Sequence, residues 1–398
     1  MLIDLNEKLH IVIFIPSIET GGVERNTIIV ANYLVSRGYK VSLVYVRAVD
    51  GMLARFDDGV GLINIGGGKP LPYIHPRIND AVVVFKGFIA YLRYSSKHNN
   101  HVVVLSFQSN IVSVLASRFA GIPVAARVSN HPSHTRYETS KLQKISERLK
   151  LVVYRLASAV ITNSNVTSSY FESRLPVMVK TIYNPIDFEL LDVMLREQVD
   201  HPWLVAERDY KIVVAVGRLV SQKNFSVLIK AFSKLPSDLN SKLIIIGEGE
   251  ERRKLESLIN DLGLDDRVDL IGYRKNVHPF VSKADLFVLS SNFEGLPNAL
   301  IEAIAVGTPA VSTNCLSGPA EILCEGNAGD LVPINDSDSL SVAINENLIN
   351  SERTDKLFSQ AEIKIREFDK NITLREYEDL LRFLAGFPVV RECAVDEL

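Results

Sequence analysis

The sequence predicts an α/β protein with two doubly wound, Rossmann-like domains, each built on a parallel sheet. Short apolar runs rich in Val and Ile recur along the 398 residues, and each is followed by a stretch with a helical pattern. The runs are continuously apolar rather than alternating, which is typical of strands that are buried on both faces. A chain of this length also fits two domains of ordinary size, each with its own core.

The predicted strands fall into two sets, separated by a stretch without a clear pattern. They are residues 10–16, 41–46, 102–107, 124–129 and 159–164 in the first set, and 211–217, 243–249, 268–273, 286–291 and 309–314 in the second. The boundary between the two sets falls near Asn184 and Pro185, where the residue before the proline disfavours the helical conformation. We therefore expect a first domain over residues 1–185 and a second domain over 186–364, facing each other.

Composition excludes several classes of protein. A hydrophobic fraction of 47%, a charged fraction of 23% and a net charge of −3 are those of a globular protein, not of a strongly basic nucleic-acid binder. The three cysteines show no spacing that suggests a metal site or a disulfide framework, which favours a reducing compartment. The longest apolar run, Ala81–Leu92, contains Lys86 and is shorter than the ~20 residues that span a bilayer. We expect a cytoplasmic protein, at most peripheral on a membrane.

The small net charge conceals two unequal halves. Residues 1–185 hold 21 Lys and Arg against 11 Asp and Glu, so their net charge is +10. The remaining residues carry a net charge of −13. Such an asymmetry suggests that the first half meets an anionic surface or ligand.

Cations follow the first strand of the second set. Gly217 ends the strand, and Arg218 and Lys223 flank the loop after it. Ligands of open α/β sheets bind at the carboxyl ends of the strands, where a pair of cations suits a pyrophosphate. Two solvated surface cations are the alternative.

A pair of glycines, Gly21 and Gly22, follows the first strand of the chain and opens a helix. Glycine lets a ligand approach the backbone closely, and a helix N-terminus offers N–H groups to an anion. The spacing does not fit the dinucleotide pattern G-x-G-x-x-G, so a plain strand-to-helix turn is equally open.

Two glutamates mark the strongest segment. Glu294 lies in a loop, and Glu302 lies inside the helix that begins near Pro297. The N-terminus of that helix can hold a phosphate, which repels a carboxylate. We therefore expect Glu302 to accept hydrogen bonds from neutral vicinal hydroxyls, such as those of a ribose, and Glu294 to reach the other end of the ligand. Two unrelated surface glutamates are the alternative.

These motifs resemble those of retaining glycosyltransferases of family 4, which have the GT-B fold. The resemblance rests on FEGLPNALIEAIAVGTPAV, GRLVSQKN, LIIIGEGEERRKLE and GGVER, and it extends over nearly the whole chain. SNHPSHTR, YNPID and SGPAEIL are similar to segments of bacterial enzymes that build O-antigen, capsule or lipid-linked oligosaccharides. The resemblance implies two Rossmann-like domains whose parallel sheets face each other across a cleft, with residues 365–398 packing back on the first domain.

The resemblance also implies roles for individual residues. Arg218 and Lys223 would neutralise the diphosphate leaving group of a nucleotide-sugar, in place of a metal ion. Glu302 would hold the ribose hydroxyls, and Glu294 would contact the transferred sugar. Further donor contacts would come from Gly21, Gly22, Tyr273, Arg274, Gly295, Leu296, Pro297 and Asn298.

The remaining expectations concern catalysis. His131 would contact the donor sugar and join Glu294, Arg218 and Lys223 as a candidate catalytic residue, with His134 as the second candidate. A turn residue or an acceptor contact is the alternative for His131. The family needs neither a metal ion nor another cofactor. Front-face attack and a short-lived covalent intermediate are both open as the route to retention.

Residues 141–159 predict an amphipathic helix. Its apolar stripe consists of Leu142, Ile145, Leu149, Val152 and Leu156, and the adjacent cations are Lys141, Lys144, Arg148 and Arg155. The stretch at residues 85–97 adds three cations and two tyrosines without an acid. We expect this region to contact an anionic membrane surface or the acceptor. A core-facing helix with a solvated basic margin is the alternative.

The sequence as a whole predicts a metal-independent, retaining hexosyl or N-acetylhexosaminyl transferase on the inner face of the bacterial cytoplasmic membrane. The expected donor is a UDP-sugar, and the expected acceptor is a polyprenyl-diphosphate-linked or other cell-envelope glycan. The expected partners are these two substrates, anionic lipid and other glycosyltransferases of one pathway, without nucleic acid. The alternatives are other nucleotide-sugar chemistry, such as a 2-epimerase or a phosphorylase, and a non-catalytic subunit that binds nucleotide-sugar.

Overall fold

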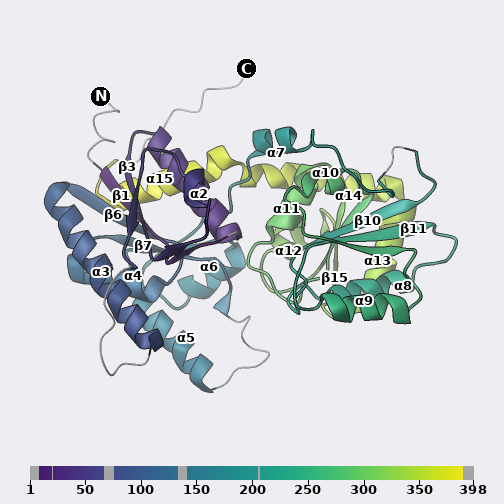
Figure 1. The fold of residues 1–398 in the computed structure, drawn as a ribbon, viewed down its shortest axis with the longest axis horizontal. Helices are drawn as coiled ribbons and strands as arrows, with labels where there is room; N and C mark the ends of the chain where they lie inside the picture. Colours follow the sequence, from purple (N-terminus) through teal and green to yellow (C-terminus); the bar gives the residue numbers. More distant parts are fainter. Residues whose placement is uncertain (1–8, 20, 67–75, 133–140, 205–206, 389–398) are drawn as a thin grey trace. The chain divides into compact units, whose positions relative to one another are not determined.

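The computed structural model describes residues 9–19, 21–66, 76–132, 141–204 and 207–388, and it divides into two compact units (Figure 1). The first unit comprises Met1–Pro185 and Asn371–Leu398, and the second comprises Ile186–Lys370. The return to the first unit therefore begins at Asn371, rather than at residue 365. The reason is local, since the Ile186 N–H donates to Phe368 O (2.8 Å) and the Lys370 N–H donates to Ile186 O (2.9 Å).

The described residues of the first unit form a parallel sheet of seven strands, in the order β5-β3-β1-β6-β7-β8-β9. Its two central strands, Leu9–Phe14 and His101–Ser106, are short, rich in β-branched residues and buried apart from His101, as their sequences predict. The strands are β1 (Leu9–Phe14), β3 (Lys40–Tyr45), β5 (Val60–Asn64), β6 (His101–Ser106), β7 (Val124–Val128), β8 (Ala159–Thr162) and β9 (Met178–Thr181), and β2 (Ser17–Ile18) pairs with β4 (Arg47–Ala48) apart from this sheet.

Helices connect the strands of the first unit. They are α2 (Gly22–Ser36), α3 (Pro76–His98), α4 (Asn110–Ala120), α5 (Lys141–Tyr154) and α6 (Asn165–Glu172), with a 3-10 turn at Leu53–Arg55 and the returning helix α15 (Lys370–Leu384). Polar bonds tie α15 to this unit, because the Glu378 carboxylate accepts from the hydroxyls of Tyr33 and Tyr39, each at 2.7 Å. Tyr377 is fully buried in the core.

The described residues of the second unit form a parallel sheet of six strands, in the order β12-β11-β10-β13-β14-β15. The strands are β10 (Lys211–Val216), β11 (Ser241–Ile246), β12 (Val268–Gly272), β13 (Leu286–Leu289), β14 (Ala310–Thr313) and β15 (Asp330–Val332). The helices are α7 (Phe188–Met194), α8 (Phe225–Ser233), α9 (Arg252–Asp261), α10 (His278–Ser282), α11 (Asn298–Ala305), α12 (Pro319–Ile322), α13 (Ser337–Ile349) and α14 (Ser351–Ile365), with 3-10 turns at Cys324–Gly326 and Arg366–Phe368.

Both sheets have a point at which the strand order reverses. In the first unit it lies between β1 and β6, and in the second it lies between β10 and β13. The loops at the carboxyl ends of two such strands diverge and leave a crevice, which is where open α/β sheets bind their ligands. The candidate residues of each unit can therefore be placed relative to this reversal.

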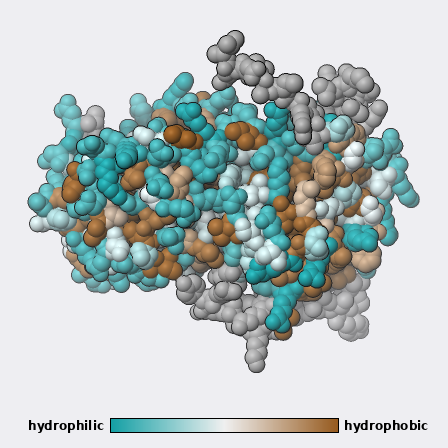
Figure 2. Space-filling model, turned by 180° about the vertical axis from the view of Figure 1, so that it is seen from behind, coloured by the Kyte–Doolittle hydropathy of each residue, from teal (hydrophilic) through white to brown (hydrophobic). Residues whose placement is uncertain are grey.

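The surface of the described residues is mixed in character. Figure 2 shows apolar residues set among hydrophilic ones on the face opposite to that of Figure 1. No described helix combines the length with the hydropathy that a membrane-spanning segment needs. The Asp336 carboxylate accepts from the backbone N–H groups of Asp338 and Ser339, so it caps the N-terminus of α13.

Candidate active site

The loops that follow β10 and β13 meet at the strand reversal of the second unit. The Asn292 N–H donates to Gln222 O (2.8 Å), and the Ser290 hydroxyl donates to Lys223 O (2.8 Å). The Gln222 side chain returns a bond to Phe293 O (3.0 Å). These bonds fix the two loops relative to each other, so the residues they carry have defined positions.

An ion pair lies between these two loops. The Lys223 Nζ donates to Glu294 Oε1 at 2.6 Å, and the Ser291 hydroxyl donates to the same oxygen at 2.6 Å. Both members are largely buried, with side-chain exposures of 16% for Lys223 and 8% for Glu294. Two residues that are remote in sequence, and that the sequence predicts at one site, are therefore in direct contact.

Glycines allow the close packing of this region. A Cβ on Gly217 would lie 3.0 Å from the Lys223 Cε, so the glycine makes room for the lysine stem. Gly318 has a φ of +87°, and a Cβ there would lie 2.7 Å from Gly295 O. The Ser317 hydroxyl donates to that same carbonyl (2.9 Å), which braces the loop before α11.

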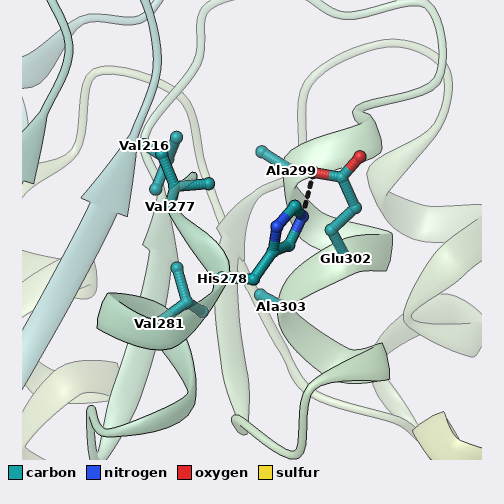
Figure 3. A pocket seen from close by; sticks show the side chains of 7 residues that line it. All are labelled: Val216, Val277, His278, Val281, Ala299, Glu302 and Ala303. Atoms are coloured by element: carbon teal, nitrogen blue, oxygen red, sulfur yellow. Dashed lines mark hydrogen bonds and ion pairs between the residues drawn. The ribbon is translucent and has the colours of Figure 1, made fainter. Parts of the chain in front are cut away.

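Glu302 projects from α11 toward α10, where it meets His278 (Figure 3). The His278 Nε2 lies 3.3 Å from Glu302 Oε2. Both line a small pocket together with Val216, Val277, Val281, Ala299 and Ala303. The structure thus places Glu302 in an apolar pocket beside a histidine, and one wall of that pocket comes from Val216 at the end of β10.

The backbone segment before α11 is enclosed. Gly295, Leu296 and Pro297 are buried, and Asn298 is half-buried at the first position of the helix. Pro297 stands at the N-cap position with no side-chain capping bond. The Leu300 N–H already donates to Pro297 O (3.0 Å). The N-terminal end of the helix still carries the positive end of its dipole, which attracts a phosphate.

Arg218, Tyr273 and Arg274 stand apart from the Lys223–Glu294 pair. Arg218 is exposed, and its guanidinium forms no ion pair with any residue in the described ranges. Tyr273 is 69% exposed and follows β12, the edge strand. The Arg274 guanidinium donates to Tyr273 O at 3.3 Å. The structure places these residues at strand ends of the same sheet, without contact with Glu294.

The strand reversal of the first unit holds the two N-terminal glycines. Gly21 caps α2, and a Cβ on it would lie 2.3 Å from Glu24 Oε2. The Glu24 side chain is buried, and its Oε1 accepts from Gln108 Nε2 (3.3 Å), which follows β6. Gly21 is therefore needed to leave space for a buried carboxylate, and Gly22 begins the helix.

His131 lies in the first unit, after β7. It is 6% exposed, and its ring packs edge-on against Tyr170 with the ring centroids 4.9 Å apart. His134, the second candidate, lies outside the described residues. The structure shows a buried, packed histidine, and the donor contact of His131 stays a prediction.

Helix α5 ends at Tyr154, so the predicted helix over residues 141–159 is too long, and Arg155 and Leu156 lie in the turn that follows it. The apolar stripe of this region faces solvent. Ile145, Leu149, Val152 and Leu156 are 60%, 55%, 57% and 43% exposed. The core is met by other residues, Val153, Tyr154 and Ala157. The alternative of a core-facing stripe is therefore wrong for these four residues. Arg148 and Arg155 are exposed as well, whereas the side chains of Leu142, Lys141 and Lys144 lie outside the described part of the chain.

Three residues of the site are absent from the sequence-based prediction. Ser291 donates to Glu294. The apolar run at residues 286–291 ends in two serines, and this change from apolar to polar residues at a strand end could have identified Ser291 as a site residue. Cys315 lies near Glu294 and Lys223, and burial raises the pKa of its thiol to about 12, which keeps it protonated. His278 lies in a segment without a pattern, where the sequence carries no signal for its contact with Glu302.

Comparison with known proteins identifies the two domains. Residues 20–190 match the family described as Glycosyltransferase Family 4, and residues 198–364 match the family described as Glycosyl transferases group 1. With the two parallel-sheet units, these matches define a glycosyltransferase of the GT-B fold, as predicted. Within that class, residues 20–190 form a family 4 domain and residues 198–364 form a group 1 domain.

Individual relatives include two proteins of Campylobacter jejuni. One, N-acetylgalactosamine-N,N'-diacetylbacillosaminyl-diphospho-undecaprenol 4-alpha-N-acetylgalactosaminyltransferase, is 31% identical over 53% of this chain and 54% of its own length. The other, GalNAc-alpha-(1->4)-GalNAc-alpha-(1->3)-diNAcBac-PP-undecaprenol alpha-1,4-N-acetyl-D-galactosaminyltransferase, is 26% identical over 94% of this chain and 98% of its own. The chain spans about half the length of three curated relatives that it matches at above 30% identity.

Solved structures share the fold. HepE of Anabaena, in complex with UDP, has a TM-score of 0.73 at 20% identity, over 94% of this chain and all of that one. At this identity the likeness establishes the fold alone.

Proposed function

We propose that the chain transfers a sugar, with retention and without a metal ion, from a UDP-sugar to a polyprenyl-diphosphate-linked or other cell-envelope glycan. The observation that carries this proposal is the Lys223–Glu294 pair at the strand reversal of the second sheet. A cation and a carboxylate in one crevice suit a ligand with a diphosphate at one end and hydroxyls at the other.

Lys223 and Arg218 stabilise the departing diphosphate. An ammonium has three donors, so Lys223 can bind Glu294 and still donate to phosphate oxygens. Arg218 offers a planar fork that suits phosphate. Negative charge develops on the leaving group as the glycosidic bond breaks, and fixed cations that are already in place lower the barrier to that step.

The two glutamates orient the donor. Glu294 uses one oxygen, Oε1, for Lys223 and Ser291, and its Oε2 is suited to accept from a hydroxyl of the transferred sugar. Glu302 accepts from the ribose hydroxyls, and the N–H groups that open α11 complete the contacts. Tyr273 and Arg274 contact the base. Because all these residues belong to one rigid sheet and its loops, the donor is held in a single orientation.

The exposed face of α5 supports a lipid-linked acceptor. Ile145, Leu149 and Val152 on the helix and Leu156 just after it are exposed beside Arg148 and Arg155, and this combination suits an interface with anionic lipid. Two relatives are named for acceptors that carry undecaprenyl diphosphate. We place the enzyme on the inner face of the cytoplasmic membrane, beside the other glycosyltransferases of one pathway, with this helix toward the lipid.

One screen tests the proposal. The purified chain is incubated with single UDP-sugars and a polyprenyl-diphosphate glycan, with and without EDTA, and the products are read by mass spectrometry. We expect one donor to add the mass of one hexose or N-acetylhexosamine, equally with EDTA present, and we expect the new linkage to be α by NMR. A β linkage would exclude retention, and loss of product with EDTA would exclude metal independence. An epimerised sugar without transfer, or UDP binding without any product, would replace the proposal by one of its alternatives.

A further inference from the structure

The His278 ring lies between two acceptor groups. Its Nδ1 lies 3.0 Å from Asn276 Oδ1, and its Nε2 lies 3.3 Å from Glu302 Oε2 (Figure 3). The His278 backbone N–H also points to Asn276 Oδ1, at 3.2 Å. Both ring nitrogens of a side chain that is only 4% exposed therefore face oxygen atoms.

The orientation of the Asn276 amide is fixed by its own partners. Its Nδ2 donates to Met194 O (2.7 Å) and to Glu197 Oε2 (2.9 Å), and both of these atoms can only accept. Exchanging the amide O and N would place an oxygen against two acceptors. Oδ1 must therefore face His278, and Nδ1 must carry a proton to bind it.

The contact between His278 Nε2 and Glu302 Oε2 also requires a proton, and because an imidazole is a stronger base than a carboxylate, the ring holds it. A neutral imidazole with a proton on Nδ1 would present a lone pair on Nε2 to the Glu302 carboxylate, and two acceptors repel. A ring with both protons donates to Asn276 at one side and to the carboxylate at the other. The remaining pocket lining is apolar, which strengthens an ion pair formed within it.

A second histidine in the same unit shows the opposite arrangement. His201 Nε2 lies 3.2 Å from Asp269 Oδ2, but its Nδ1 accepts from the Trp203 backbone N–H at 3.2 Å. A neutral ring with its proton on Nε2 satisfies both contacts. Both histidines are buried and contact a carboxylate through Nε2. They differ at Nδ1, which faces a hydrogen-bond donor in His201 and an acceptor in His278.

We propose that His278 is an imidazolium in the folded protein and acts as a positioning residue that fixes the carboxylate of Glu302. This inference rests on the proposed function, in which Glu302 holds the donor ribose. Figure 3 shows one carboxylate oxygen directed to the imidazole and the other directed away from it. A bond from a buried cation to one oxygen restricts the rotation of the carboxylate, so its geometry toward a pair of hydroxyls is set before the donor binds.

The protonation state is tested on the free protein by ¹⁵N NMR of the histidine rings at pH 7. His278→Phe and His201→Phe assign the two signals by their disappearance. We expect two protonated nitrogens in His278, and one protonated and one unprotonated nitrogen in His201. An unprotonated nitrogen in His278 would overturn the inference. This measurement needs no donor, so it stands even if the proposed function fails.

The positioning role is tested by calorimetric binding of UDP to the full chain. We expect His278→Phe to weaken UDP binding about tenfold, the order of one hydrogen bond to a charged group, and Glu302→Gln to weaken it as well. The double variant should bind no more weakly than Glu302→Gln alone, because the histidine acts through the glutamate. His201→Phe is the matched control and should bind UDP as the wild type does.

Kinetics separate this role from a purely structural one. Because ribose contacts are the same in the ground state and in the transition state, His278→Phe should raise KM for the donor with little change in kcat. His278→Gln keeps a hydrogen-bond donor and should recover part of the affinity for UDP. It also serves as the second variant if His278→Phe does not fold. Additive effects with Glu302→Gln, or unchanged UDP binding, would overturn the positioning role. A wild type that binds UDP without transferring sugar would contradict the proposed function alone.

Discussion

The two units share one sheet architecture but place different chemistry at their strand reversals. At the reversal of the second unit, a lysine and a glutamate are paired and buried, with Glu302 on the neighbouring helix. At the reversal of the first unit, the described contact joins the Glu24 carboxylate to the Gln108 amide. The second arrangement suits a diphosphate and its sugar, whereas the first suits groups that donate hydrogen bonds.

The net charges of the two units do not indicate which of them has the paired cation at its strand reversal. With its returning segment, the first unit has a net charge of +7, and the second unit has −10. The basic unit carries exposed arginines on α5 and just after it, while the acidic unit has the partly buried Lys223 at its strand reversal. The comparison teaches that net charge describes a surface, whereas the position of one paired cation on the sheet describes a binding site.

The largest expected effect lies at the second reversal. Lys223→Ala and Glu302→Ala should each lower kcat/KM for the donor by about 10²–10³-fold. Lys223→Ala removes charge stabilisation in the transition state, and Glu302→Ala removes the ribose contact and so acts through KM. The measurement is product formation at saturating acceptor. Lys234→Ala, which removes an exposed lysine of the same unit, is the control. A wild-type kcat/KM in either site variant would contradict a role of the second unit in donor binding and transfer.

The next effect concerns the exposed face of α5. Replacing Arg148 and Arg155 by Gln should weaken binding to anionic vesicles by about 2 kcal/mol, at ~1 kcal/mol for each cation near the surface. Cosedimentation with phosphatidylglycerol vesicles at low and high salt measures it. Val342→Ser, at a 64% exposed position of the second unit, is the control for lost apolar surface. Equal binding to neutral and anionic vesicles would show that α5 is not an electrostatic membrane contact.

A third prediction concerns the core of the first unit. His10 is buried between Ser42 and Ser95, and burial lowers its pKa to about 4. The folded state thus keeps His10 neutral while the unfolded chain takes up a proton below pH 6.5, so stability is lost as the pH falls from 6.5 toward 4. At pH 5 the loss attributable to His10 is about 2 kcal/mol.

Urea unfolding at pH 7 and pH 5 measures this loss. His10→Gln should lose less stability between the two pH values than the wild type, and His98→Gln, at an exposed histidine, should behave as the wild type. If His10→Gln and the wild type show the same pH dependence, another group causes the loss.

The smallest effect is expected at His131. If it contacts the donor sugar, His131→Ala should lower kcat/KM about tenfold, the low end for one positioned polar group. Tyr170→Phe keeps the aromatic ring that packs on His131 and serves as the control. Unchanged kinetics would limit His131 to packing, and the donor contacts would then belong to the second unit.

Much of the fold is predictable because buried parallel strands have a distinctive sequence. All ten predicted strands are present, from β1 to β14. The missed strands of the two large sheets, β5, β9 and β15, lie at sheet edges, and β15 has only three residues. The two-residue strands β2 and β4 are missed as well. An edge strand is covered on one side only, so β5 keeps Gly61 and Leu62 exposed and has no continuous apolar run to identify it.

Sequence by itself determined the residue types at the strand ends: the loop cations after β10, the two glutamates around α11 and the family to which these motifs belong. Tertiary structure alone decided which of them touch. It pairs Lys223 with Glu294, leaves Arg218 exposed, sets His278 against Glu302 and turns the stripe of α5 toward solvent. The physical reason is that a spacing pattern determines which residues share one face of a helix or strand. Burial and hydrogen bonding depend on which other parts of the chain pack against that face.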